Sequence, residues 1–229
     1  MKRTLALATM LGAWACTDAR AGESFMGRTI ARTMSHHGAS WLVRPERQAE
    51  EGTALLLEQL GLSPGQVACD LGAGIGYYTL RMAQKVGPSG RAVAVDIQPE
   101  MLEMLQSRAE KAGVKNVETI LGTQDDPKLG RARCDLILLV DVYHELSDPP
   151  AMLAAMKAAL RPGGHIALVE YRAEDPSVPI KPLHKMGKAQ MLAEFGSAGL
   201  APIRSFDGLP WQHLVFFGAE ETSPPKTKD

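Results

Sequence analysis

The central part of the chain alternates between short apolar runs and longer segments in which apolar residues recur every three or four positions. Short runs bounded by glycine, proline or polar residues predict strands, and the wider spacing predicts helices. The run Cys134–Val140 is almost uninterrupted, as expected for a strand buried on both faces of a parallel sheet. The predicted strands are 66–71, 92–96, 117–121, 134–140 and 165–171, followed by a closing pair at 202–206 and 213–217.

Helices are predicted between these strands. Pro99 and Pro149 suit first helical turns, Asp148 can cap the second of these helices, and Gly87 and Gly163 follow helix ends. Strand and helix therefore alternate, which predicts an α/β fold, a doubly wound parallel sheet with helices on both faces. The predicted helices are 23–37, 45–60, 77–86, 99–112, 149–161 and 189–199, and the segment 172–185 is a long connection.

The loop after the first of these strands reads Asp70-Leu71-Gly72-Ala73-Gly74-Ile75-Gly76. Ligands of open α/β sheets bind at the carboxyl ends of the strands, and glycines let the backbone approach a ligand closely. Asp96 ends the next strand, where a carboxylate can accept hydrogen bonds from ribose hydroxyls. These features predict a nucleotide-type cofactor, but they do not by themselves separate a dinucleotide from S-adenosylmethionine.

Three segments resemble the motifs of class I S-adenosylmethionine-dependent methyltransferases, in the order and at the distances typical of that family. They are the glycine stretch 67–76, the fourth strand 135–141 and the turn 160–164. The resemblance extends over residues 45–218 and implies a Rossmann-like sheet of seven strands whose last strand runs antiparallel, with S-adenosylmethionine as the cofactor. The flanking segments resemble a bacterial subgroup whose members often carry signal peptides.

The resemblance also implies how the cofactor is held. The implied contacts are Asp70 near the methionine ammonium, Gly72, Gly74 and Gly76 against the cofactor, Asp96 on the ribose, Ile97 beside the adenine, Thr123 or Asp125 at the adenine amine, and Asp141. Thr123 stands where the family often has an acidic residue, which makes Asp125 the alternative at that position.

The acceptor should approach the segment after the fourth strand. Methyl transfer needs an acceptor that is positioned and whose proton is removed or accommodated. His144 is a candidate general base because its ordinary pKa lies near neutrality, with Glu145 or Asp141 to orient it. The alternative is that His144 packs locally while Asp141 touches the cofactor. The candidate catalytic residues are His144, Asp141, Tyr143 and Glu145, and the candidate substrate-binding residues are Arg172, His184 and Arg44, which would suit an anionic acceptor or form ordinary surface charge.

Composition narrows the classes of partner. The formal net charge is -1, with 25 basic and 26 acidic side chains, which argues against nucleic acid as the main partner. No group of His and Cys has the spacing of metal ligands, so no metal is expected. Cys69 and Cys134 fall on neighbouring strands in a predicted register that separates them by about five residues, or roughly 16 Å, too far for a disulfide.

The N-terminus has the features of a secretory signal peptide. Lys2 and Arg3 precede an apolar run, and small residues at 13–15 and 19–21 offer cleavage sites. The run is too short to span a bilayer comfortably, so no stable membrane span is expected. The sequence thus predicts a signal peptide at 1–21, export to the periplasm, a methyltransferase domain with an N-terminal helical extension at 22–218, and a disordered tail at 219–229. If the signal is not used, the protein is cytoplasmic.

Three functions remain open on these residues. The first is methyl transfer from S-adenosylmethionine to a small-molecule acceptor. The second is a nicotinamide-dependent oxidoreductase, although that glycine pattern has two residues between its second and third glycines, whereas Gly74 and Gly76 are separated by one. The third is a module that binds S-adenosylmethionine without catalysis.

Overall fold

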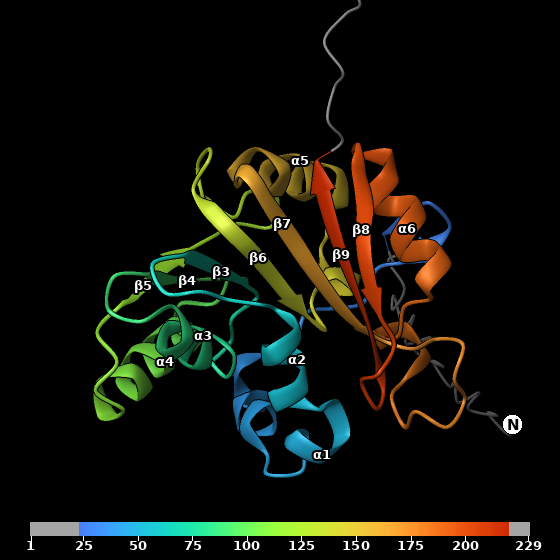
Figure 1. Ribbon diagram of the computed structural model, residues 1–229. Helices are drawn as coiled ribbons and strands as arrows, with labels where there is room; N and C mark the ends of the chain where they lie inside the picture. The colour runs from blue at the N-terminus through green and yellow to red at the C-terminus, as the bar shows by residue number, and fades with distance from the viewer. Residues whose placement is uncertain (1–22, 220–229) are drawn as a thin grey trace, which may run out of the picture.

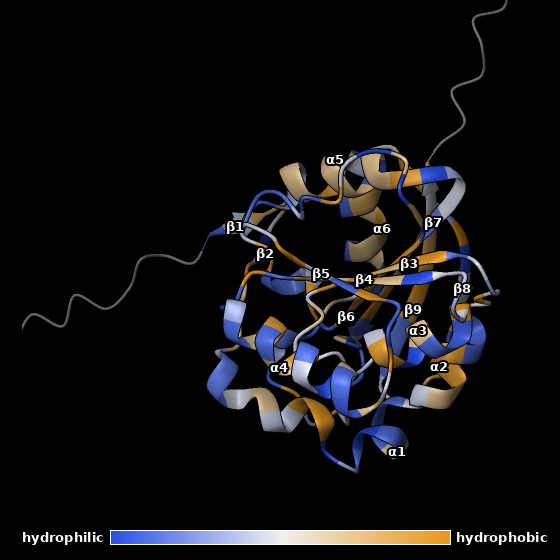
Figure 2. Cartoon of the chain, turned by 90° about the vertical axis from the view of Figure 1, so that its left-hand side faces the viewer, coloured by the Kyte–Doolittle hydropathy of each residue, from blue (hydrophilic) through white to orange (hydrophobic). Residues whose placement is uncertain are grey.

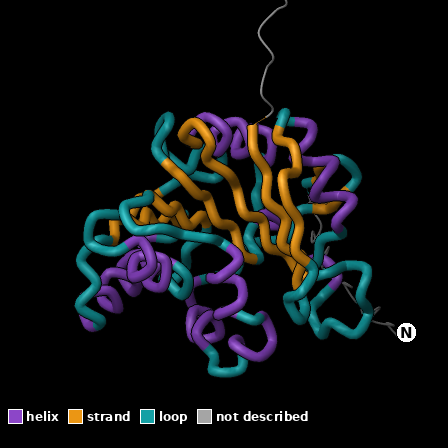
Figure 3. The backbone as a smooth tube through the Cα atoms, viewed as in Figure 1, coloured by secondary structure: helices purple, strands orange, loops and turns teal. Residues whose placement is uncertain are grey.

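The chain folds around one seven-stranded sheet (Figures 1 and 3). The computed structural model describes residues 23–219, so the predicted signal peptide at 1–21 and the tail at 220–229 lie outside the described residues. Ala219, expected in the tail, closes the last strand. The strands of the sheet are β3 (Val67–Leu71), β4 (Arg91–Asp96), β5 (Val117–Leu121), β6 (Cys134–Val140), β7 (Leu160–Tyr171), β8 (Leu200–Phe206) and β9 (Gln212–Ala219).

The topology is the one expected from sequence. The spatial order is β5-β4-β3-β6-β7-β9-β8, and β3 to β7 pair in parallel. Strand β9 pairs antiparallel with both β7 and β8, so the last strand of the chain is inserted against the direction of its neighbours. From β3 the chain adds β4 and β5 on one side and then β6 and β7 on the other, so the direction of winding switches beside β3. Ligands of open α/β sheets bind at such a switch point.

Helices cover both faces of the sheet. Leu153 of α5 and Phe195 of α6 pack with Ile137 of β6 on one face, and Leu56 of α2 and Met82 of α3 pack with Leu138 on the other. Figure 2 shows hydrophobic residues concentrated on the strands between these layers. The helices are α1 (Arg47–Glu51), α2 (Thr53–Gln59), α3 (Thr79–Val86), α4 (Pro99–Lys111), α5 (Pro149–Ala159) and α6 (Lys188–Ser197). No helix among residues 23–219 is long and apolar enough to cross a membrane.

The N-terminal segment differs from its prediction. A helix was expected over 23–37, but strands β1 (Ser24–Phe25) and β2 (Arg28–Thr29) form a small antiparallel hairpin. The turn residues Met26 and Gly27 both have positive φ, 48° and 86°, as the tight turn of a two-residue hairpin requires. An extended segment and the 3-10 helix η1 (His36–Val43) follow, and the helix expected over 45–60 is divided into α1 and α2 at Gly52.

Cys69 and Cys134 form a disulfide between β3 and β6, contrary to the sequence prediction. Their Cα atoms are 6.0 Å apart. The pairing places Cys69 level with Ile137, only three positions beyond Cys134, so the predicted offset was too large. The register of β6 against β7 also shifts between Cys134 and Leu136, and Cys134 lies in the same core cluster as Cys69 and Ile137. The two half-cystines therefore lie in the core on the same face of the sheet.

Candidate functional site

The loop after β3 lines a large cavity and requires glycine at position 72. Gly72 has a φ of 70°, and a Cβ there would lie 2.5 Å from both methyl groups of Val142, so only glycine fits. Asp70, directly before the loop, is buried and accepts a 2.5 Å hydrogen bond from the Thr79 hydroxyl. Burial raises the pKa of Asp70 to about 6. A positively charged ligand group at this loop would stabilise the ionised form of this buried carboxyl group.

Asp96 lies at the carboxyl end of β4 and lines the cavity. Its Oδ2 accepts from the backbone N–H of Gly74 at 2.9 Å, and its Oδ1 accepts from that of Gln98 at 2.9 Å. Burial raises the pKa of Asp96, and these backbone donors oppose the shift. Each carboxylate oxygen can accept a second hydrogen bond, so the ribose role implied by the sequence is compatible with this geometry.

Asp141 is held in an unusual backbone conformation at the end of β6. It has a φ of 55°, which is rare for a residue other than glycine and is often found at functional sites. Its Oδ2 accepts from Gln212 Nε2 at 2.7 Å, whereas its buried Oδ1 has no partner among the described residues. Burial and the neighbouring Glu51 and Glu170 raise the pKa of Asp141 well above its ordinary value.

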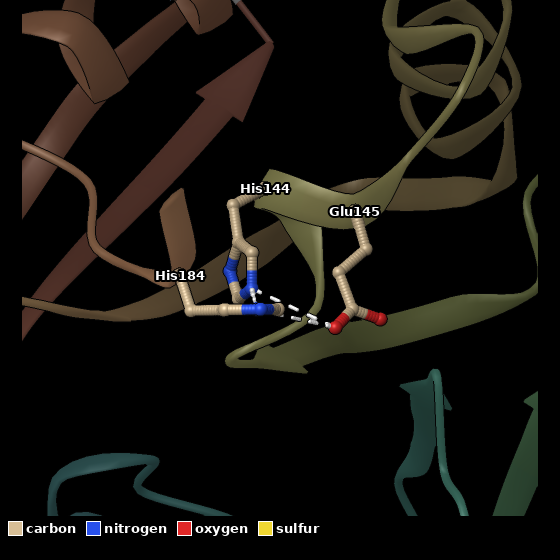
Figure 4. A group of neighbouring side chains, drawn as sticks. All are labelled: His144, Glu145 and His184. Atoms are coloured by element: carbon tan, nitrogen blue, oxygen red, sulfur yellow. Dashed lines mark hydrogen bonds and ion pairs between the residues drawn. The ribbon is translucent and has the colours of Figure 1, made fainter. Parts of the chain in front are cut away.

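Two histidines and a glutamate converge in the segments after β6 and β7 (Figure 4). His144 and Glu145 belong to the 3-10 helix η2 (Tyr143–Glu145), and His184 belongs to η3 (Pro182–His184) in the connection after β7. His144 Nε2 lies 3.0 Å from His184 Nδ1 and 3.7 Å from Glu145 Oε1, and His184 Nδ1 lies 3.6 Å from the same carboxylate oxygen.

Glu170 orients His144. One of its carboxylate oxygens is 2.6 Å from His144 Nδ1, and the other accepts from the His144 backbone N–H at 3.2 Å. Burial lowers the pKa of His144, but Glu170, Glu145 and Asp141 together outweigh burial, so the pKa is raised. Glu145 or Asp141 was expected in this orienting role. Glu145 instead approaches Nε2, and Asp141 is held by Gln212, because Glu170 projects from β7 directly beside the His144 turn.

These groups share one large cavity. It has a volume of about 1180 Å³, somewhat above the range of about 300–1,000 Å³ typical of ligand sites. Its lining includes Asp70, Gly72, Gly74, Asp96 and Ile97 from the segments at the ends of β3 and β4, and Asp141, His144, Glu145, Lys181 and His184 from the segments after β6 and β7. The cavity is therefore large enough for a cofactor and a second molecule.

The N-terminal segment forms one wall of this cavity. Residues 30–35 line it, together with residues 179–181 and His184 of the connection after β7. The segment is held by hydrogen bonds from the Ala31 N–H to the His144 carbonyl and from Gln98 Nε2 to the Met34 carbonyl. Sequence reasoning missed this wall because it assigned 23–37 to a helix.

S-adenosylmethionine fits these residues. Gly72 and Gly74 line the cavity, Asp96 stands at the end of β4, and Ile97, 37% exposed, offers an apolar surface for an adenine. The free Oδ1 of Asp141 and the carboxyl group of Asp70 are acceptors suited to an ammonium. Thr123 also lines the cavity.

Several predicted site residues lie elsewhere. Arg172 donates to the carbonyls of Asp207, Leu209 and Pro210, and it fastens the β8–β9 turn outside the cavity. Arg44 stacks on Trp41 and bonds Glu50 and Glu51. Backbone carbonyls and local carboxylates thus already occupy both guanidinium groups. The anionic-acceptor patch expected from Arg172, His184 and Arg44 is not assembled, and only His184 reaches the cavity.

Three further predictions are corrected by packing. Tyr143 is fully buried against Phe195, with ring centroids 5.0 Å apart, and does not line the cavity. Asp125 is exposed, accepts from the Thr123 hydroxyl at 2.7 Å and does not line the cavity. Gly76 packs against Leu105 rather than against the cavity.

Comparison with known proteins agrees with this geometry. A family model described as "Methyltransferase domain" matches residues 62–198. Protein-L-isoaspartate O-methyltransferase of Methanothrix thermoacetophila is 34% identical over 118 residues, which cover 50% of this chain and 52% of that protein. Demethylmenaquinone methyltransferase of Lactococcus lactis is 26% identical over 137 residues, covering 58% of this chain and 52% of that protein. The chain thus spans about half the length of these relatives.

A solved structure shows the same fold. The S-adenosylmethionine-dependent methyltransferase from Aquifex aeolicus superimposes with a TM-score of 0.76 at 24% identity, covering 81% of this chain and 98% of the other. Likeness at this identity supports the fold, and the match of the family model supports the class.

Proposed function

Because the chain belongs to the methyltransferase-domain family, whose cofactor is S-adenosylmethionine, we propose that it transfers a methyl group from S-adenosylmethionine to a small-molecule acceptor. One observation carries the proposal. A single cavity runs from the glycine loop and Asp96 to His144, Glu145 and His184, so a cofactor and an acceptor can meet inside it. The cofactor would supply a methyl group on a positively charged sulfonium.

The residues of this chain would hold and orient the two partners. Asp96 would accept from the ribose hydroxyls, Asp70 and Asp141 would accept from the ammonium, and Gly72 would allow close approach. Positioning of this kind accounts for much of the rate of a displacement reaction. His144 lines the cavity and is the candidate proton acceptor through Nε2, with Glu170 fixing its ring.

Calorimetry of the full chain with S-adenosylmethionine, S-adenosylhomocysteine and NAD tests the cofactor. We expect saturable binding of the first two and none of NAD. Asp96→Asn should weaken binding by about tenfold to a hundredfold, because it removes a charged acceptor. Glu103→Ala, an exposed carboxylate change on α4 outside the cavity, is the matched control and should bind normally. A preference for NAD, or equal binding by both variants, would overturn the proposal.

Turnover separates an enzyme from a module that only binds the cofactor. Release of S-adenosylhomocysteine is followed with panels of hydroxyl, thiol and amine acceptors. Once an acceptor is found, His144→Ala with full turnover would exclude His144 as the base.

We also propose that the protein is exported, as its N-terminal sequence predicts. The Cys69–Cys134 disulfide supports this, because disulfides persist mainly in oxidising compartments. Cell fractionation of the native host, with mass spectrometry of the N-terminus, tests it. A full-length protein found only in the cytoplasm would contradict export.

A further inference from the structure

The cluster of His144, Glu145 and His184 has the dimensions of a metal site. Each residue offers one donor atom to the same point, and the three separations are 3.0, 3.6 and 3.7 Å. Zinc bonds to histidine and carboxylate of about 2.0–2.2 Å place tetrahedral ligands roughly 3.3–3.6 Å apart, whereas an octahedron with the same bonds places neighbours about 2.8–3.1 Å apart. The separations of 3.6 and 3.7 Å are closest to the tetrahedral value, whereas the 3.0 Å separation between the two imidazole nitrogens is a hydrogen-bond distance that would have to widen on binding a tetrahedral ion.

A second observation is independent of these separations. His144 is 2% exposed, and both oxygens of Glu170 engage it, one at the ring Nδ1 and one at the backbone N–H. A metal-binding histidine usually donates its other ring N–H to a carboxylate, which fixes the tautomer and orients the ring. Glu170 does this here, and it leaves the Nε2 lone pair of His144 directed at His184.

We propose that His144 Nε2, Glu145 Oε1 and His184 Nδ1 bind one Zn²⁺ ion. Three protein ligands from imidazole and carboxylate leave a fourth position open, which is the arrangement of catalytic rather than structural zinc sites. The site requires the two loops after β6 and β7 to meet, and the contact of η2 with η3 places them together. The sequence predicted no metal because His144 and His184 lie forty positions apart and have no motif spacing.

The open position would face the acceptor end of the cavity. His144, Glu145 and His184 all line this cavity, together with the glycine loop and Asp96. An ion there would select acceptors that carry a hydroxyl or thiol donor atom and would lower the pKa of that group. His144 would then be a ligand and not the proton acceptor. This role rests on the proposed methyl transfer, whereas metal binding itself can be measured without it.

The test uses the full chain without a polyhistidine tag, stripped with EDTA and freed of the chelator. Zn²⁺ is titrated by calorimetry, and bound metal is counted by mass spectrometry after gel filtration. We expect one ion per chain. Co²⁺ in place of Zn²⁺ should give the intense visible absorption of tetrahedral cobalt. No binding of either ion, or weak octahedral absorption only, would overturn the proposal.

Variants locate the ion. His184→Ala and Glu145→Gln should abolish the cobalt spectrum, and Glu170→Gln should weaken affinity by about tenfold to a hundredfold, because it loosens the orienting carboxylate. His37→Ala, an exposed histidine outside the cavity, should bind as the parent does. Equal binding by parent and His184→Ala would place the ion elsewhere and refute the site.

Titration of the same samples with S-adenosylhomocysteine tests the methyl-transfer proposal separately from the metal proposal. Cofactor binding without Zn²⁺ binding would leave methyl transfer standing and remove the metal. Zn²⁺ binding without cofactor binding would leave the metal site standing and remove the proposed function.

Discussion

At the scale of a residue, the Asp70 side chain affects both the free energy of unfolding and the proposed binding of the cofactor. Its carboxyl group is buried, and its pKa of about 6 exceeds the value of about 3.9 expected in the unfolded chain. A raised folded pKa gives stability that is fully present below about pH 4 and is lost as the pH rises through 6. Above that pH the folded protein carries a costly buried anion, which the proposed ammonium of the cofactor would compensate.

We therefore predict opposite effects of Asp70→Asn on stability and binding. Without ligand at pH 7.5, the variant should gain about 2 kcal/mol in free energy of unfolding, and near pH 4 the gain should vanish. Asn can still accept from the Thr79 hydroxyl, so this hydrogen bond is retained. Affinity for S-adenosylmethionine should fall by about tenfold or more.

Urea denaturation at the two pH values and calorimetry measure these effects. Thr79→Val is the matched control, since it removes the hydrogen bond and leaves the charge. A variant less stable than the parent at pH 7.5 would show that other groups of the protein already compensate the Asp70 charge when no ligand is bound.

At the level of elements, one ion pair ties the N-terminal hairpin to the domain. Arg28 on β2 forms bonds of 2.8 and 2.9 Å with Glu194 on α6, whose side chain is fully buried. Arg28 also donates to the His144 carbonyl at 3.0 Å, so the pair reaches the acceptor end of the cavity.

Arg28→Ala should lower the free energy of unfolding by about 3–5 kcal/mol, because it leaves a buried carboxylate without its partner. Arg28→Ala with Glu194→Gln should recover part of this loss, since the remaining amide is neutral and Gln190 still donates to it. Chemical denaturation of the three proteins measures the coupling. Additive losses in the double variant would mean that the pair contributes only by packing.

The Cys69–Cys134 disulfide joins β3 to β6 at the strand that carries Asp70. It closes a loop with a sequence separation of 65, for which loop-closure entropy predicts a stabilisation on the order of 4 kcal/mol. The double variant Cys69→Ala, Cys134→Ala should lose stability of this order. A reductant should destabilise the parent in denaturant and leave the double variant unchanged. An equal response of both proteins to the reductant would show that the bond is not formed in solution.

The elements that sequence predicts are those fixed by local signals. Strands β4, β5 and β6 and helices α4 and α5 follow from apolar runs and from proline or Asp caps, and their predicted bounds are close to those observed. The hairpin at 24–29 was missed because its turn, Met26-Gly27, has only one residue typical of such turns. The disulfide was missed because strand register and a local irregularity are properties of pairing, not of either strand alone.

The candidate site divides in the same way. Asp70, Gly72, Gly74 and Asp96 lie within one βαβ unit, so a local pattern identifies them. The acceptor end joins η2, β7, η3 and the N-terminal segment, which meet only in the folded chain. In the sequence, Glu170 is a single charged residue near the end of an apolar strand. A charged residue in a buried strand needs a buried partner, so this position could have indicated a contact such as that with His144.

At the scale of the whole molecule, one wall of the cavity is a segment that forms neither strand nor α-helix. Residues 30–36 lie over the switch point and are held by hydrogen bonds to His144 and Gln98. Arg32 and Thr33 within the segment are exposed. A ligand that fills the cavity would contact the inner side of this segment, so ligand binding and ordering of the segment should be coupled.

We predict that S-adenosylhomocysteine at a hundred times its Kd raises the free energy of unfolding by about 2.7 kcal/mol. Hydrogen exchange should locate part of this gain at residues 30–36, where amides should slow by about tenfold or more, because 1.4 kcal/mol of local protection is a tenfold change in rate. Amides of β8, on the far edge of the sheet and outside the cavity, should slow only by as much as global unfolding does. Stabilisation without added protection at 30–36 would mean that the cofactor binds beneath a segment that is already closed, and ligand entry would then have to occur past residues 179–184.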